Sequence, residues 1–364
     1  MTRFGYTLMG EGHDPRTLVR NAVLAEQAGF EHAVFSDHYH PWLPSQHHSP
    51  FTWSVLGAVA HATERMELAT MVTCPIIRYH PAIIAQAAAT VGVMSDGRFT
   101  LGLGAGERLN EHVVGAGWPP ADVRHEMLME AIEILRALWS GDYVSHRGRH
   151  FTVEDARIFD LPSDPIEIFV AASGPESAAV AAKAGDGICA IEPEADLIEA
   201  YVAAGGTRES TWSQVPLSWH ADATKGAEQA RDQFRFGFPG WKVMSELPNP
   251  VNFAAATETV TTEAMAEMIP CGPDPERHAE AIRAYIDAGF ERIAVVQVGD
   301  DQEGFLRFWS NEVLPPPLSN AGREAARPLK ERRNRVDGHV EARPLPGRPE
   351  RLCSVEWKLA TGQT

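Results

Sequence analysis

The sequence predicts the α/β fold class, in the form of a (β/α)8 TIM barrel with insertion segments at the C-terminal mouth. Short apolar segments alternate with segments of helical periodicity, and the apolar segments lack the strict alternation of half-exposed strands, as in a parallel sheet buried on both faces. One helix–turn–strand unit also recurs, since Ala-Gly-Phe-Glu stands in LAEQAGFEHAVFSD (24–37) and YIDAGFERIAVVQVGD (285–300), with a looser copy in AAKAGDGICAI (181–191). In this unit glycine ends the helix with a positive φ, and phenylalanine packs where the strand begins. Such repetition favours a closed barrel over the alternative, an open doubly wound sheet.

The apolar segments and the periodic segments between them define the expected elements. The predicted strands cover residues 3–8, 32–36, 66–73, 98–103, 166–171, 187–191, 215–220 and 292–298. Helices are predicted where apolar residues recur at helical spacing, over residues 17–28, 125–139 and 278–288.

Two segments interrupt this alternation, and the end of the chain differs from the rest. Residues 40–52 are rich in His, Pro and Ser and read as a long loop, and residues 221–265, with FGFPGW and SELPNP, read as an insertion over one mouth of the barrel. Residues 1–318 are predicted to form the catalytic barrel. Residues 319–364 are predicted to be a disordered basic tail or a docking arm, because residues 321–364 hold ten Lys/Arg against six Asp/Glu and little apolar periodicity.

Composition excludes several classes of partner. The net charge is −17, with 49 acidic and 32 basic residues, which argues against nucleic acid or a membrane surface as a partner. No long apolar run or secretory signal is apparent, and the four cysteines form no CxxC pair. We therefore expect a cytoplasmic protein with reduced thiols and a small-molecule substrate.

Polar residues follow the predicted strands at the end where barrel enzymes build their sites. Ser36, Asp37 and His38 follow the second strand, and either face a ligand or only cap a turn. The fourth strand runs into LGLGAGERLNEH (101–112), whose glycines allow close approach of a flat ligand and are followed by Glu107 and Asn110.

Other motifs narrow the chemistry. The fifth strand ends in AASGPESAA (171–179), where amide groups at the start of a helix suit a phosphate. The dinucleotide fingerprint, GxSxG and HExxH are absent, so no metal site is predicted despite five histidines between His32 and His48. A histidine and a glutamate around a glycine-lined slot suit proton transfer beside hydride transfer to a cofactor.

Four segments resemble a known family: SDHYHPW (36–42), TCPIIRYHPAIIAQAAAT (73–90), GRFTLGLGAGERLNEH (97–112) and EILRALWSGDYVSHRGRHF (133–151). They are similar to the luciferase-like superfamily, and within it to the coenzyme F420-dependent oxidoreductases of the F420-dependent glucose-6-phosphate dehydrogenase group. The resemblance covers residues 3–315 and implies a homodimeric barrel with the deazaflavin coenzyme F420 at its C-terminal mouth. It also implies hydride transfer between the deazaflavin C5 and an alcohol or carbonyl compound.

The resemblance implies site residues position by position. His38 is implied as the base toward substrate, Glu107 as the proton partner of the cofactor, Trp42 as the substrate-pocket wall and Glu11 as a pocket carboxylate. Val72 is implied to follow a non-proline cis peptide under the deazaflavin ring. The implied cofactor contacts are Asp37, Val72, Cys74, Ala105, Gly106, Asn110, Ser173, Gly174, Glu176 and Ser177.

Departures from the family concern the substrate. Where glucose-6-phosphate enzymes hold the sugar phosphate with a threonine, a lysine and an arginine, this sequence has Ile191, Glu194 and Glu267. Carboxylates in place of cations repel a phosphate, so glucose 6-phosphate is predicted not to be the substrate. The alternative readings are an FMN-dependent luciferase-like monooxygenase and a non-catalytic barrel that binds a flavin-like ligand.

Overall fold

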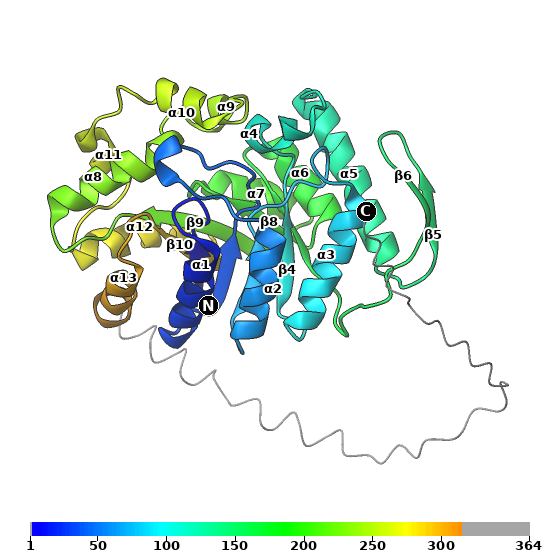
Figure 1. The fold of residues 1–364 in the computed structure, drawn as a ribbon, viewed down its shortest axis with the longest axis horizontal. Coiled ribbons are helices and arrows are strands. Elements are labelled where there is room, and N and C mark those ends of the chain that lie inside the picture. The colour runs from blue at the N-terminus through cyan, green and yellow to red at the C-terminus, as the bar shows by residue number, and fades with distance from the viewer. Residues whose placement is uncertain (1, 315–364) are drawn as a thin grey trace, which may run out of the picture. The chain divides into compact units, whose positions relative to one another are not determined.

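The structure is a computed structural model that describes residues 2–314. Within this range eight parallel strands close into a barrel in the order β1-β10-β9-β8-β7-β4-β3-β2 (Figure 1). The barrel strands are β1 (Arg3–Leu8), β2 (His32–Phe35), β3 (Glu67–Thr70), β4 (Phe99–Leu103), β7 (Ile168–Ala171), β8 (Gly187–Ala190), β9 (Thr211–Leu217) and β10 (Arg292–Gln297). The predicted TIM barrel is confirmed, and the tail predicted for residues 319–364 lies outside the described residues.

Helices surround the barrel and follow its strands in the (β/α) order (Figure 1). They are α1 (Pro15–Gln27), α2 (Thr52–Ala62), α3 (Pro81–Met94), α5 (Ala121–Leu138), α6 (Pro175–Ala184), α7 (Ala195–Ala203), α12 (Pro275–Asp287) and α13 (Gln302–Phe308), the last continuing into a π-helical turn η5 (Trp309–Val313). The short α4 (Arg108–Glu111) and turn η2 (His112–Val114) precede α5.

The repeated Ala-Gly-Phe-Glu unit forms the same turn at both sites. Gly29 and Gly289 have φ values of 93° and 97°, and the amides of Phe30 and Phe290 each reach back to a helix carbonyl five residues earlier. Both phenylalanine side chains are buried where the next strand begins. The looser copy differs, because Gly185 ends α6 with a φ of −92°.

Two parts of the fold depart from the sequence prediction. The seventh barrel strand begins at Thr211 rather than 215, because polar residues interrupt its apolar pattern while Trp212 fills the barrel interior and stacks on Phe169 at 4.7 Å. An antiparallel hairpin, β5 (Val144–Arg147) with β6 (Thr152–Ala156), stands between α5 and β7 and was not predicted. Its exposed, polar strands have little of the apolar signal by which a strand is recognised.

The predicted insertion between β9 and β10 is helical. It contains α8 (Ala223–Phe234), η4 (Arg235–Gly237), α9 (Trp241–Met244), α10 (Pro250–Ala256) and α11 (Thr262–Met268). Its residues Phe236, Met244 and Phe253 pack with Trp42 and Leu109 from the loops after β2 and β4. The insertion therefore lies at the C-terminal mouth, on the same side of the barrel as α4 (Figure 1).

The loop of residues 36–51 between β2 and α2 carries one 3-10 turn, η1 (Pro44–Gln46). Ser45 and Gln46 donate hydrogen bonds to the carbonyls of Asp232 and Gln233 near the end of α8. The insertion and the loop after β2 thus hold each other in place beside the strand ends.

Candidate active site

His38 stands at the C-terminal end of β2 with one ring nitrogen engaged and one free. Its Nδ1 contacts the Glu11 carboxylate, which comes from the loop after β1 and is buried. Its Nε2 has no hydrogen-bond partner among the residues that the structure describes. The imidazole meets the indole of Trp42 edge-on, with ring centroids 4.9 Å apart. This arrangement puts the proton on Nδ1 and leaves Nε2 as the acceptor.

Neighbouring charges control the protonation of His38. Burial alone would lower the pKa of the imidazole, but the carboxylates of Glu11 and Glu107 outweigh burial and raise the pKa above its ordinary value. Arg78 opposes this with a smaller effect. His38 is therefore a stronger base than a free histidine.

Asn110 joins the His38 loop to Glu107. Its Oδ1 accepts hydrogen bonds from the amides of Tyr39 and His40, at 2.7 and 2.9 Å, and its Nδ2 donates to Glu107 Oε1 at 2.6 Å. The two backbone donors fix which side of the amide is oxygen, so the donor side must face Glu107. His38 and Glu107 thus lie at the same end of the barrel, as the sequence predicts.

The Asp37 carboxylate is fully engaged within the chain. Oδ2 accepts from Trp53 Nε1 and Thr73 Oγ1, and Oδ1 accepts from a guanidinium N–H of Arg78 and from the hydroxyl of Tyr79. Two carboxylate oxygens have about four acceptor positions, and these four donors fill them. A cofactor contact from Asp37 stays a prediction, and its carboxylate has no acceptor position to spare for one.

The end of β3 meets the end of β4 through small residues. A cis peptide bond joins Met71 and Val72, at the position that the resemblance implies. A Cβ added to Gly104 would lie 2.7 Å from Val72 Cγ2 and 3.7 Å from the Sγ of Cys74, so only glycine fits beside these side chains. Burial, with Glu107 and Glu111 nearby, raises the pKa of the Cys74 thiol well above its usual range, so Cys74 stays a neutral thiol.

Arg124 supports the backbone of the predicted cofactor loop. It donates to the carbonyls of Ala105 and Gly106, at 3.3 and 3.0 Å, and lies over the ring of Trp118 with 3.9 Å to the centroid. Gly106 has a φ of 78°, a conformation that favours glycine. The carbonyls of Ala105 and Gly106 therefore face Arg124 on α5.

Two charged residues beside this loop were missed by the sequence analysis. Arg78 has 7% of its side chain exposed and donates to both the carbonyl and the carboxylate of Asp37. Glu111 is buried at the end of α4 and accepts from the backbone amide of Arg78. Burial, with help from Glu107 and Asp37 and against the influence of Arg78, raises the pKa of Glu111 to about 7. From the sequence, one can say only that both residues lie in segments that resemble the luciferase-like superfamily.

The predicted phosphate turn after β7 is partly occupied by its own side chain. The amides of Ser173 and Gly174 donate to Ser177 Oγ, at 3.1 and 3.2 Å. The amides of Glu176 and Ser177 open α6 and have no acceptor among the described residues, and open space adjoins Gly174 where a Cβ would be. This helix start suits an anionic group, as the sequence predicts.

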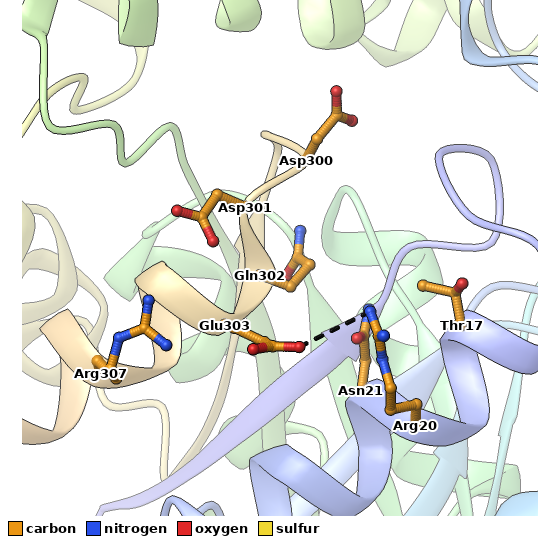
Figure 2. Close-up of a pocket in the computed structure, with 8 residues that line it drawn as sticks. All are labelled: Thr17, Arg20, Asn21, Asp300, Asp301, Gln302, Glu303 and Arg307. Atoms are coloured by element: carbon orange, nitrogen blue, oxygen red, sulfur yellow. Dashed lines mark ion pairs between the residues drawn. The ribbon is translucent and has the colours of Figure 1, made fainter.

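Two cavities are described, and neither is lined by His38 or Glu107. One, of about 170 Å³, lies between α1 and the start of α13, where Arg20 pairs with Glu303 beside Asn21 (Figure 2). The other lies on the outer side of α1 and α2 and is mostly apolar. The width of a slot between His38 and Glu107 stays a prediction.

Residues 2–314 contain neither a metal-ligand cluster nor a membrane-spanning helix. The described side chains include no group of three or more His, Cys, Asp or Glu that could hold a metal ion. His32, one of the five clustered histidines, is buried at the start of β2 beside Trp212, away from His38 at the other end of the strand. No helix of this range is long and apolar enough to cross a membrane.

Comparison with known proteins defines the class. Residues 1–292 match the luciferase-like monooxygenase family, and the chain belongs to it. Within that family it is 36% identical over 325 residues to an F420-dependent glucose-6-phosphate dehydrogenase of Microbacterium testaceum, covering 86% of this chain and 96% of that protein. It is 38% identical over 318 residues to an F420-dependent hydroxymycolic acid dehydrogenase of Mycobacterium tuberculosis, covering 85% and 87%.

A solved structure is also similar. An F420-dependent secondary alcohol dehydrogenase, in complex with an F420-acetone adduct, superposes with a TM-score of 0.79 at 27% identity, covering 87% of this chain and 99% of that chain. The predicted membership of the luciferase-like superfamily, in the branch that holds these F420-dependent enzymes, is therefore confirmed.

Proposed function

We propose that this chain is a coenzyme F420-dependent oxidoreductase that transfers a hydride between the deazaflavin C5 and the alcohol or carbonyl carbon of a small molecule. One observation carries the proposal: Nδ1 of His38 contacts Glu11, its Nε2 is free beside Trp42, and Asn110 links the loop that follows His38 to Glu107. Relatives that are 36% and 38% identical to this chain are named as F420-dependent dehydrogenases.

The residues present fit this cofactor. The open side of Gly174 and the free amides at the start of α6 suit its phosphate, and small residues from Gly104 to Gly106 suit the approach of a flat ring. When bound, the deazaflavin supplies a carbon that accepts or releases a hydride. The chain supplies the proton transfers and the positioning.

His38 handles the substrate proton. Oxidation of an alcohol removes a hydride from its carbon and a proton from its oxygen, and Nε2 of His38 is the free acceptor for that proton. The imidazolium that results is stabilised by the Glu11 carboxylate against Nδ1. In the reverse direction the same Nε2–H donates the proton to the carbonyl oxygen.

Glu107 has one oxygen occupied by a hydrogen bond and one left for proton exchange. Because Asn110 Nδ2 donates to Oε1, that oxygen accepts, and a proton on the carboxyl group belongs on Oε2. We assign Glu107 as the acid–base partner of the cofactor: its Oε2 would donate a proton toward the bound ring or accept one from it, according to the direction of the reaction.

The wall beside His38 favours an apolar substrate. Trp42 stacks on Phe236 with centroids 5.0 Å apart and meets Phe253 edge-on at 5.1 Å. At the end of β8, Ile191 and Glu194 stand where a phosphate would need donors, so the substrate proposed here is an uncharged alcohol, ketone or aldehyde and not glucose 6-phosphate. A relative named a secondary alcohol dehydrogenase supports this class.

Titration with oxidised coenzyme F420 and, separately, with FMN tests the cofactor. Of the two, only F420 is expected to bind tightly. Addition of secondary alcohols to the F420 complex is then expected to bleach the deazaflavin absorbance. The variant His38→Ala should keep F420 binding and lose turnover, whereas a non-catalytic binder would show no turnover in either protein. Tight FMN binding without F420 binding, or micromolar KM for glucose 6-phosphate, would refute the proposal.

We also propose a homodimer located in the cytoplasm. The apolar groove lined by Val19, Phe51 and Val55 on the outer side of α1 and α2 supports an interface between copies, since Phe51 is 55% exposed there. Sedimentation of the purified protein should give twice the mass of one chain. The variant Phe51→Glu should sediment with the mass of a single chain. Fractionation of the source cells tests the location.

A further inference from the structure

A buried arginine connects the loop after β2 to α4. One guanidinium nitrogen of Arg78 donates to the backbone carbonyl and to the carboxylate of Asp37, the residue directly before His38. Burial alone would lower the pKa of Arg78, but Asp37, Tyr79 and Glu111 outweigh burial, so the guanidinium stays charged. Arg78 therefore fixes both the backbone and the side chain that set the position of His38.

The Glu111 carboxyl group lies next to the backbone amide and the Nε of Arg78. Its Oε2 accepts the backbone amide of Arg78 at 2.9 Å, and its Oε1 lies 3.7 Å from Arg78 Nε. That oxygen and that nitrogen are both buried without a hydrogen-bond partner among the described residues, and they face each other as an ion pair. The Glu111 stem packs under Gly106, since a Cβ there would lie 3.0 Å from Glu111 Cγ.

The contact joins the two loops that carry the chemistry. Asp37 leads into His38, and Glu111 ends the four-residue α4 that Glu107 precedes. The amide of Glu111 also donates to the carbonyl of Glu107. A shift of Arg78 against Glu111 would therefore move the imidazole relative to the Glu107 carboxylate.

We propose that Arg78 and Glu111 are positioning residues that brace the loop after β2 against α4 and so set the separation of His38 from Glu107. They touch neither substrate nor cofactor, and the inference rests on the proposed function only for its activity readout. Asn110 is a second, neutral tie between the same loops. A misplacement of about 1 Å between reacting groups costs on the order of a hundred-fold in rate.

The test is a double-mutant cycle on the full chain with F420, at about pH 8, where Glu111 is ionised because its pKa is about 7. Arg78→Lys keeps the charge but cannot contact Asp37 and Glu111 together. Arg78→Lys and Glu111→Gln are each expected to lower kcat by about ten- to a hundred-fold, with KM and the Kd of F420 within about three-fold of the parent. The double variant should be little worse than either single variant, because each breaks the same brace.

Matched controls separate positioning from stability. Arg98→Lys removes guanidinium bonds to the carbonyls of Ala60, Thr63 and Met66 at the other end of the barrel. Glu130→Gln alters a carboxylate that accepts backbone amides of the hairpin. Both should keep kcat, and Glu130→Gln should combine additively with Arg78→Lys.

Each outcome bears on the proposal. Retention of kcat within two-fold in Arg78→Lys, equal loss in Arg98→Lys, or multiplied losses in the Arg78→Lys, Glu111→Gln double variant would overturn the brace. If Arg78→Lys does not fold, Glu111→Gln decides alone, by its loss of kcat at unchanged Kd for F420. Absence of F420 binding by the parent would instead overturn the proposed function, and it is distinguishable because it precedes every variant.

Discussion

The buried carboxyl group of Glu111 gives a stability prediction that needs neither substrate nor cofactor. Its pKa is raised from 4.5 to about 7, chiefly by burial. A group whose folded pKa lies above its unfolded pKa binds its proton more tightly in the folded chain, so its contribution is fully present below the unfolded value and is lost as pH rises through the folded value. At about 1.4 kcal/mol per pKa unit, this shift is worth about 3 kcal/mol of unfolding free energy.

The perturbation is Glu111→Gln, which cannot ionise and therefore lacks this pH dependence. As pH rises from about 5 to about 8, we expect the unfolding free energy of the parent to fall by about 2.5 kcal/mol relative to that of Glu111→Gln. Titrating groups remote from Glu111 behave alike in both proteins and cancel in the difference, and the neighbouring Cys74 thiol titrates above this pH range because burial raises its pKa well above the usual range.

Urea unfolding of both proteins across this pH range measures the difference directly. The control is Glu130→Gln, since the pKa of Glu130 is lowered, so its contribution is lost only as pH falls through the acid range. A parent-minus-variant difference that stays constant from about pH 5 to about pH 8 would show that Glu111 does not hold a proton in the folded chain, and would refute the reasoning.

Three further predictions address the base, the helix turn and the substrate wall. Alcohol oxidation should rise with pH through a pKa above 6.5, because neutral His38 is the base, and Glu11→Gln should move this limb to lower pH; an unmoved limb would contradict the assignment. Gly29→Ala should cost about 1 kcal/mol in urea unfolding through its φ of 93° alone, whereas Gly117→Ala, equally unobstructed and without a positive φ, should be neutral. Phe236→Ala should raise KM for apolar alcohols more than for polar ones, and equal changes would argue against an apolar wall.

The sequence was sufficient for the barrel because its signals are local. Each buried parallel strand is a short apolar run, and the glycine turns before β2 and β10 require a positive φ that the sequence itself marks. The start of β9 was not predicted because Thr211 and Ser213 are polar yet fully buried. Ser213 donates a hydrogen bond to the Ala190 carbonyl. The hairpin was not predicted because Val153 is the one buried residue on its two strands, too little for an apolar pattern.

The candidate site was predicted only as far as strand ends reveal it. His38 and Glu107 follow β2 and β4 directly, so their meeting at the mouth follows from the barrel. Arg78 and Glu111 are 33 residues apart, and their contact depends on how the loop after β3 folds beneath α4. Sequence spacing carries no information on such a contact, and the filled acceptor positions of Asp37 were equally invisible.

The charge balance of the mouth explains why these buried groups matter together. Glu11, Asp37, Glu107 and Glu111 gather there, and Arg78 is the cation that contacts Asp37 and Glu111. The excess negative charge, here from Glu11 and Glu107, raises the pKa of His38, so it would stabilise the imidazolium formed in the proposed proton transfer from an alcohol. The same excess repels a phosphate dianion, and Glu192 and Glu194 after β8 add to it. A site that makes its base stronger by this means supports the uncharged substrate proposed above.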